Sequence, residues 1–138
     1  MARVMIVDDE PAVIQMIGCV LEIRGIEVMG AQNGRDALDQ INEKRPDLII
    51  TDLVMPGMNG LDLCKTIKQD PRCEGIPLVL ITSATQDSEL ADGFWRIGTD
   101  ADEFVSKPFD PFEMADRVER LLQKGTSKGT QDTPACGP

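Results

Sequence analysis

The stretch PDLIITDLVMPGMNG, residues 46–60, decides the fold that the sequence predicts. After Pro46 has broken the preceding segment, Leu48 begins a short apolar run of the kind found in strands that are buried on both faces. The run ends on Asp52, and the Pro-Gly and Asn-Gly pairs that follow indicate a loop. The stretch therefore predicts a buried strand that presents an acid at its carboxyl end.

Segments of the same strand-like character occur on either side, and helical periodicity separates them. The other predicted strands are Arg3–Val7, Glu27–Ala31, Leu78–Thr82 and Phe104–Val105. The intervening helical faces carry Val13, Ile17, Val20 and Leu21; Ala37, Leu38 and Ile41; Leu63, Cys64 and Ile67; Leu90, Phe94 and Ile97; and Met114, Val118 and Leu121. Strict alternation predicts an α/β fold, a five-stranded parallel sheet with helices on both faces and right-handed crossovers.

Length and charge limit the domain organisation and the partners. A chain of 138 residues suits one compact domain, which we expect over residues 1–124. Residues 125–138 lose periodicity and predict a disordered tail or the stub of a linker. The net charge of -10 argues against nucleic acid or an anionic membrane as the main partner. No apolar run approaches the roughly 20 residues of a membrane span, so we expect a cytoplasmic protein.

The histidine and cysteine content excludes several classes of chemistry. The chain has no histidine, which rules out Ser-His-Asp and Cys-His nucleophiles and HExxH metal sites in this chain. Its four cysteines lack CxxC spacing, and this argues against a zinc site or structural disulfides. Any acid, base or metal chemistry must therefore use carboxylates, hydroxyls and lysine.

Such groups follow the predicted strands at their carboxyl ends. Asp8 and Asp9 follow the first strand, Asp52 ends the third, Thr82 ends the fourth and Lys107 follows the fifth. These ends meet at one edge of a parallel sheet, where α/β proteins bind their ligands. Each residue alone has an ordinary structural role, an acid as a helix cap or a lysine as a solvated charge. Together the crowded carboxylates require a counter-charge. A site with only a few carboxylates and a phosphate group nearby suits Mg²⁺ better than Ca²⁺.

The chain resembles bacterial response-regulator receiver domains from Arg3 to Lys124. The stretches that carry the resemblance are VMIVDDEP, AQNGRDAL, PDLIITDLVMPGMNGL, IPLVLITS and DEFVSKPF, which occur in the family's order. The resemblance implies a flavodoxin-like, doubly wound sheet with strand order 2-1-3-4-5.

The resemblance also implies a metal site and a phosphoacceptor. Asp52 would accept the phosphoryl group and, with Asp9, bind Mg²⁺ directly, while Asp8 would act largely through water. The backbone carbonyl of Val54 would complete the protein ligands. Mn²⁺ could replace Mg²⁺, and no other cofactor is expected.

The remaining family roles concern the phosphoryl oxygens and the response to phosphorylation. Thr82 and Lys107 would bind phosphoryl oxygens, and Thr82 with Phe104 would form the switch. The altered surface would be the face of the fourth helix, fifth strand and fifth helix, where a downstream protein or a second copy would bind. Trp95 lies off the apolar stripe of the predicted fourth helix, and we interpret it as a partner-binding aromatic rather than a half-buried flank.

The predicted function is that of a signalling phosphoacceptor rather than a classical enzyme. The donor would be a phosphohistidine on a sensor histidine kinase or a histidine phosphotransfer domain. The chain would also phosphorylate itself from small donors and slowly dephosphorylate itself. Two alternatives stay open, a small Mg²⁺-dependent phosphohydrolase and a receiver-like binding module that takes no phosphate.

Overall fold

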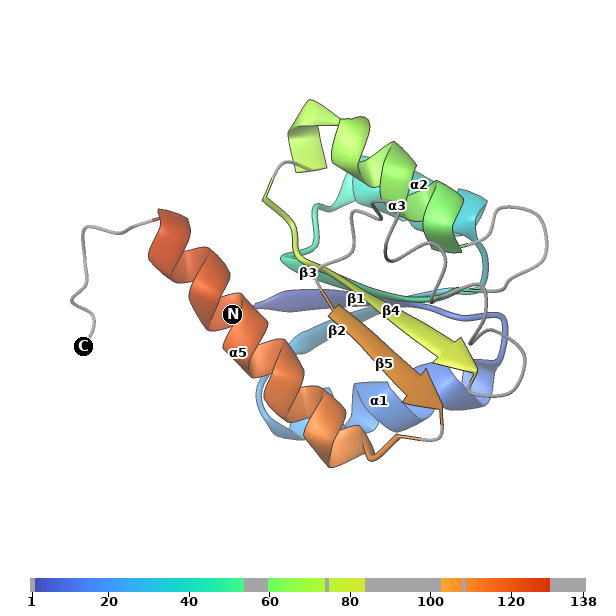
Figure 1. The fold of residues 1–138 in the computed structure, drawn as a ribbon, viewed down its shortest axis with the longest axis vertical. Coiled ribbons are helices and arrows are strands. Elements are labelled where there is room, and N and C mark those ends of the chain that lie inside the picture. Colours follow the sequence, from blue (N-terminus) through green and yellow to red (C-terminus); the bar gives the residue numbers. More distant parts are fainter. Residues whose placement is uncertain (1, 54–59, 74, 84–102, 108, 130–138) are drawn as a thin grey trace.

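Helices and strands alternate through the part of the chain that the computed structural model describes, residues 2–53, 60–73, 75–83, 103–107 and 109–129 (Figure 1). The elements are β1 (Arg3–Val7), α1 (Pro11–Ile23), β2 (Glu27–Ala31), α2 (Gly34–Glu43), β3 (Leu48–Asp52), α3 (Gly60–Gln69), the short 3-10 helix η1 (Pro71–Cys73), β4 (Leu78–Ser83), β5 (Glu103–Lys107) and α5 (Pro111–Gly129). β5 is longer than the predicted Phe104–Val105 at both ends. The predicted helix with Leu90, Phe94 and Ile97 lies outside the described residues.

The strands form a five-stranded sheet in the order β2-β1-β3-β4-β5, and all neighbouring pairs are parallel. The predicted fold class and strand order are therefore confirmed. The chain moves from β1 to β2 on one side and then returns to place β3 on the other side of β1. This reversal leaves the carboxyl ends of β1 and β3 at the crevice where such sheets bind ligands.

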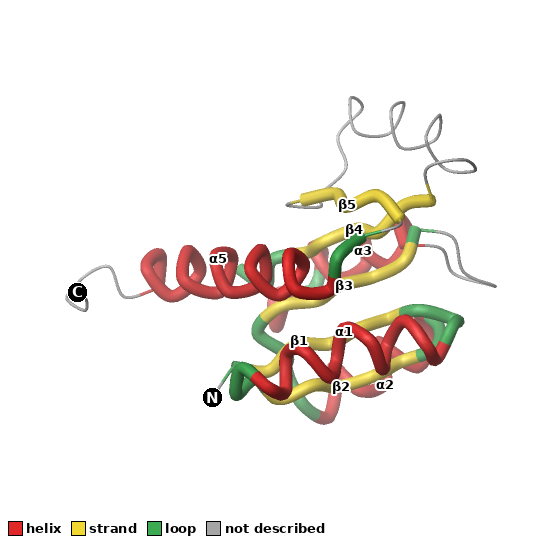
Figure 2. Tube along the Cα trace, turned by 90° about the horizontal axis from the view of Figure 1, so that it is seen from below, coloured by secondary structure: helices red, strands yellow, loops and turns green. Residues whose placement is uncertain are grey.

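Two apolar cores cover the two faces of the sheet. Helices α2 and α3 cover one face and α1 and α5 the other, as Figure 1 shows from the side and Figure 2 from below. Successive residues of β1 belong to different cores. Met5 belongs to the core beneath α2 and α3, and Ile6 belongs to the core beneath α1 and α5. Burial on both faces explains why the strands are continuously apolar rather than alternating.

Helix α1 is bounded by residues suited to its two ends. Pro11 occupies its first turn, where a missing N–H costs nothing. At its end Gly25 adopts φ 81°, and its N–H donates to the Glu22 carbonyl at 3.0 Å. The Ile26 N–H donates to the Leu21 carbonyl, also at 3.0 Å, which completes a Schellman motif. The helix that follows Asp8 and Asp9 thus has fixed limits.

Helix α5 corrects the predicted boundary of the tail. It continues to Gly129, so residues 125–129 are helical where the sequence predicted irregular structure. Gly125 and its neighbours are weak helix formers, but extending an existing helix adds a backbone hydrogen bond per residue and needs no new nucleus. Neither α5 nor any other helix in the described part of the chain combines the length and apolar character of a membrane span.

Candidate functional site

The carboxyl ends of β1 and β3 bring two acids together. Val7 is paired with Thr51 in the parallel register, so the next residues, Asp8 and Asp52, are neighbours across the two strands. Both are buried, with 0% of Asp8 and 7% of Asp52 exposed, whereas Asp9 is exposed at the start of the following loop.

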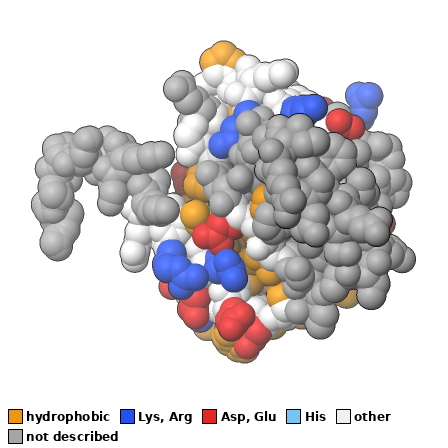
Figure 3. All heavy atoms as spheres, viewed as in Figure 1, with side chains coloured by type: hydrophobic (Ala, Val, Ile, Leu, Met, Phe, Trp, Pro, Cys, Tyr) orange, Lys and Arg blue, Asp and Glu red, His pale blue; other side chains and the backbone are white. Residues whose placement is uncertain are grey.

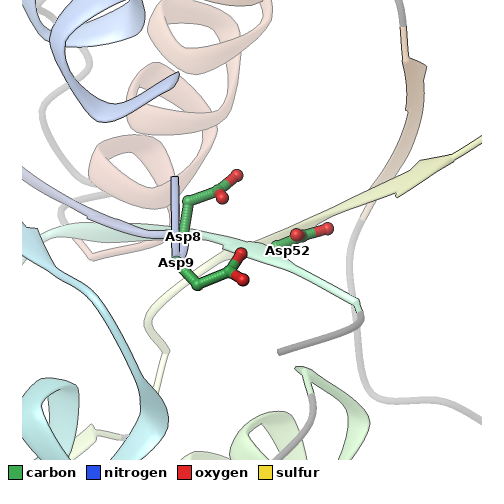
Figure 4. A group of neighbouring side chains, drawn as sticks. All are labelled: Asp8, Asp9 and Asp52. Carbon is green, nitrogen blue, oxygen red and sulfur yellow. The ribbon is translucent and has the colours of Figure 1, made fainter. Parts of the chain in front are cut away.

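These three acids form a compact cluster. Each offers a carboxylate oxygen, and these oxygens all lie within 4.8 Å of one another. Figure 4 shows the three side chains at the edge of the sheet, beyond the ends of β1 and β3. Backbone contacts hold Asp8, because its Oδ1 accepts the Glu10 N–H at 2.9 Å and its own N–H donates to the Ala31 carbonyl at 3.0 Å. The cluster is therefore attached to rigid strand ends.

The donor set fits a small divalent cation. Its ligand atoms are hard carboxylate oxygens, with no sulfur or imidazole in the group. Two of the acids are buried, and like charges at such separations repel one another strongly outside bulk water. Three carboxylates are too few for the six to eight ligands of Ca²⁺, but they leave the open positions that Mg²⁺ fills with water or phosphate oxygens.

Crowding of these acids predicts that Asp52→Asn stabilises the metal-free protein. Removing one buried negative charge should raise the free energy of unfolding by on the order of 1 kcal/mol, and Mg²⁺ should remove most of this gain. Urea denaturation in EDTA and in Mg²⁺ measures both effects, with Asp62→Asn as the control because Asp62 is exposed on α3. An Asp52→Asn protein less stable than wild type in EDTA would contradict the repulsion.

The structure places the other predicted site residues on the same edge of the sheet. Ile81 of β4 is paired with Asp52, and Thr82 follows it directly. Lys107 ends β5 and is paired with Ser83, the last residue of β4. The strand ends thus bring the backbones of Thr82 and Lys107 to the edge that carries the acids, whereas Val54 lies outside the described residues.

Phe104, the predicted switch aromatic, is half-buried on β5. It packs against the core beneath α2 and α3. It also borders a surface pocket of about 350 Å³ between β5 and α5, whose other lining residues are Val105, Phe109, Asp110, Glu113, Met114 and Arg117. The lining is mixed, because the charged side chains of Asp110, Glu113 and Arg117 lie beside the apolar ones.

Two of the three cysteines in the described part of the chain are buried. Cys19, Cys64 and Cys73 are not joined by disulfides. Cys64 and Cys73 lie in the core beneath α2 and α3, and burial raises the pKa of the Cys73 thiol. Because the thiolate is the reactive form, Cys73 behaves as a small apolar residue.

The sequence pattern predicts no role at the site for two residues that lie there. Thr51 and Gly60 both contact the backbone of Asp52 or of the residue after it. Thr51 could have been noticed as the hydroxyl in an otherwise aliphatic run, LIIT. Gly60 was interpreted only as part of a loop, because its close approach to β3 is a tertiary contact.

Comparisons with known proteins place the chain in a family. The response regulator receiver domain family matches residues 4–119. The DNA-binding response regulator MtrA of Mycolicibacterium smegmatis is 35% identical over 133 residues, which are 96% of this chain and 54% of MtrA. The chain thus spans about half the length of the curated relatives it matches.

Solved structures agree with this match. The crystal structure of a putative response regulator from Chloroflexus aurantiacus is 34% identical with a TM-score of 0.78, covering 88% of this chain and 98% of that one. The chemotaxis response regulator CheY4 of Vibrio cholerae is 30% identical with a TM-score of 0.76 and the same coverage, 88% and 98%. The family match, the sheet order and the acidic cluster typical of a receiver Mg²⁺ site show that the chain belongs to the receiver domains of two-component response regulators.

Proposed function

We propose that Asp52 accepts a phosphoryl group from a phosphohistidine and that this changes the surface that the chain offers to a downstream partner. The observation that supports this proposal is the cluster of Asp8, Asp9 and Asp52, whose oxygens lie within 4.8 Å of one another at the switch point of the sheet. The donor is a partner protein, a sensor histidine kinase or a histidine phosphotransfer domain, because this chain contains no histidine.

Phosphoryl transfer to Asp52 is a displacement at phosphorus. A carboxylate oxygen of Asp52 forms the O–P bond while the P–N bond to the donor's imidazole breaks, and the imidazole keeps the electron pair and takes a proton from solvent. Asp8, Asp9 and Asp52, with the Val54 carbonyl, would hold Mg²⁺ or Mn²⁺. When bound, the metal neutralises charge on the transferred oxygens.

The ends of β4 and β5 supply the remaining groups in this proposal. Thr82 donates its hydroxyl to a phosphoryl oxygen, and Lys107 pairs with the carboxylate before transfer and with phosphate afterwards. Their positions support these roles, because Thr82 lies near the end of β4, which pairs with β3, and Lys107 ends β5, which pairs with β4. The same groups serve small phosphodonors and slow self-hydrolysis, so the chain acts as a phosphoacceptor and not as a classical enzyme.

The surface that changes includes β5 and α5, together with the predicted fourth helix in residues 84–102. Phe104 and the pocket beside it lie between β5 and α5. Basic and acidic side chains lie next to one another around α5 (Figure 3), and Arg117 Nη1 contacts Glu103 Oε1 at 2.7 Å. Such a mixed surface suits a protein partner, a downstream target or a second copy, better than nucleic acid or a membrane. We place this activity in the cytoplasm, where sensor kinases present their phosphohistidine.

Incubation of the protein with acetyl phosphate tests the proposed function. With Mg²⁺ present, intact-protein mass spectrometry should show one added phosphoryl group, and with EDTA it should show none, because the crowded carboxylates then repel the anionic donor. Phosphoramidate serves as a second donor with a P–N bond. No added mass with either donor at saturating Mg²⁺ would refute the proposal.

A further inference from the structure

Thr51 is an unusual residue for the interior of this protein. Among the described residues the buried polar or charged side chains are Asp8, Thr51 and Asp52, so Thr51 is the one that is not a carboxylate of the cluster. Its side chain is 0% exposed, and it follows Leu48, Ile49 and Ile50 in β3. A buried hydroxyl costs free energy unless it is hydrogen-bonded, and valine would fill the same volume without that cost.

The Thr51 hydroxyl bonds to the backbone of the acceptor residue. Oγ1 donates to the carbonyl oxygen of Asp52 at 3.1 Å. This carbonyl begins the peptide that joins Asp52 to Leu53, and its orientation determines how the chain leaves the strand. The hydroxyl therefore restrains the backbone directly after the carboxylate that would take the phosphoryl group.

Gly60 approaches this peptide and the next one from α3. Its N–H donates at 2.8 Å to the Leu53 carbonyl, which belongs to the peptide that follows Leu53. A Cβ at this position would overlap the Asp52 carbonyl oxygen and lie 2.9 Å from the Leu53 Cα. Both neighbours are backbone atoms, which cannot rotate away as a side chain does, so only glycine allows this approach.

Gly18, Gly25, Gly30 and Gly75 do not share this property, because a Cβ at any of them would meet no backbone atom from elsewhere in the fold within 4 Å. A Cβ at Gly18 in α1 would meet only the side chain of Val28, at an ordinary 3.4 Å. The constraint at Gly60 is therefore specific to the end of β3. The Leu53 N–H also donates to the Ile81 carbonyl of β4 at 2.9 Å, so the peptide after Asp52 is held from the strand side as well.

We propose that Thr51 and Gly60 are positioning residues, which fix the Asp52–Leu53 peptide and thereby hold the Asp52 carboxylate at its place beside Asp8 and Asp9. This inference rests on the proposed function of Asp52. In-line attack on phosphorus depends on the direction of the attacking oxygen, and a displacement of about 1 Å can cost about a hundredfold in rate. The two residues act through the backbone and do not touch the phosphodonor.

A pair of substitutions at Thr51 separates positioning from stability. Thr51→Val keeps the volume and removes the hydroxyl, so we expect a melting temperature within about 4 °C of wild type but labelling by acetyl phosphate about tenfold slower at saturating Mg²⁺. Thr51→Ser keeps the hydroxyl and loses a buried methyl, so we expect a lower melting temperature with a labelling rate within about twofold of wild type. If Thr51 were only structural, the labelling rate would not depend on the hydroxyl while the melting temperature depends on the methyl group.

Gly60→Ala, with Gly18→Ala as its matched control, tests the other contact. Gly60→Ala should slow labelling at least about tenfold, whereas Gly18→Ala should label at the wild-type rate because its new Cβ has room. If Gly60→Ala fails to fold, the Thr51 pair decides. If the wild-type protein is labelled and Thr51→Val is labelled at the same rate, this inference is wrong and the proposed function stands. If the wild-type protein is not labelled, the proposed function and this inference are both wrong.

Discussion

In Asp52→Ala, we expect acetyl phosphate and Mg²⁺ to add no phosphoryl group. The substitution removes the oxygen that is proposed to attack phosphorus, so labelling should fall at least about a hundredfold, to the background of the assay. The protein should stay folded, because the change also removes one of three crowded carboxylates. Intact-protein mass spectrometry over a time course measures the loss, and circular dichroism confirms the fold.

Asp62→Ala is the matched control for that experiment. Asp62 is an exposed carboxylate in the first turn of α3, outside the acidic cluster. It should label at the wild-type rate. Equal labelling of Asp52→Ala and Asp62→Ala would mean that another group accepts the phosphoryl group and that the cluster has a different role.

Asp9→Ala should weaken the metal site while leaving the acceptor in place. Asp9 is the exposed acid of the cluster, and if it is a direct ligand as proposed, its loss should lower Mg²⁺ affinity by at least about tenfold. Labelling should then be slow at low Mg²⁺ and partly recover as Mg²⁺ is raised, a pattern that Asp52→Ala cannot show.

Glu10→Gln controls for charge alone. Glu10 is an exposed acid next to Asp9, and it is not one of the clustered ligands. Its removal should leave the Mg²⁺ dependence of labelling close to that of wild type. An Asp9→Ala protein with wild-type Mg²⁺ dependence would place the metal elsewhere.

The sheet and its acidic edge could be predicted because they depend on local pattern. The run from Leu48 to Ile50 is apolar on both sides of the strand, and the structure buries both faces. Once the strands are parallel, their carboxyl ends must share an edge, so the proximity of Asp8 and Asp52 follows from topology. Residue pattern and chain connectivity were sufficient for these features.

The contacts around the Asp52–Leu53 peptide could not be predicted in this way. Gly60 in an Asn-Gly pair has the same local signature whether it turns in solvent or packs against a strand, and the overlap of its Cβ with Asp52 is visible only in three dimensions. Likewise the partner of the Thr51 hydroxyl depends on the backbone geometry at the strand end. The end of α5 was missed because propensity, which disfavours Gly125 in a helix, is only a weak predictor of where a helix stops.

Direct mapping of the modified residue tests the proposal that Asp52 accepts the phosphoryl group. Protein labelled by acetyl phosphate in Mg²⁺ is treated with borohydride, which reduces an aspartyl phosphate to homoserine, and its peptides are sequenced by mass spectrometry. We expect homoserine at position 52, in the peptide that contains LIITD, and unmodified aspartate at positions 8, 9 and 62. Homoserine at any other position, or labelled protein with aspartate still at 52, would contradict it.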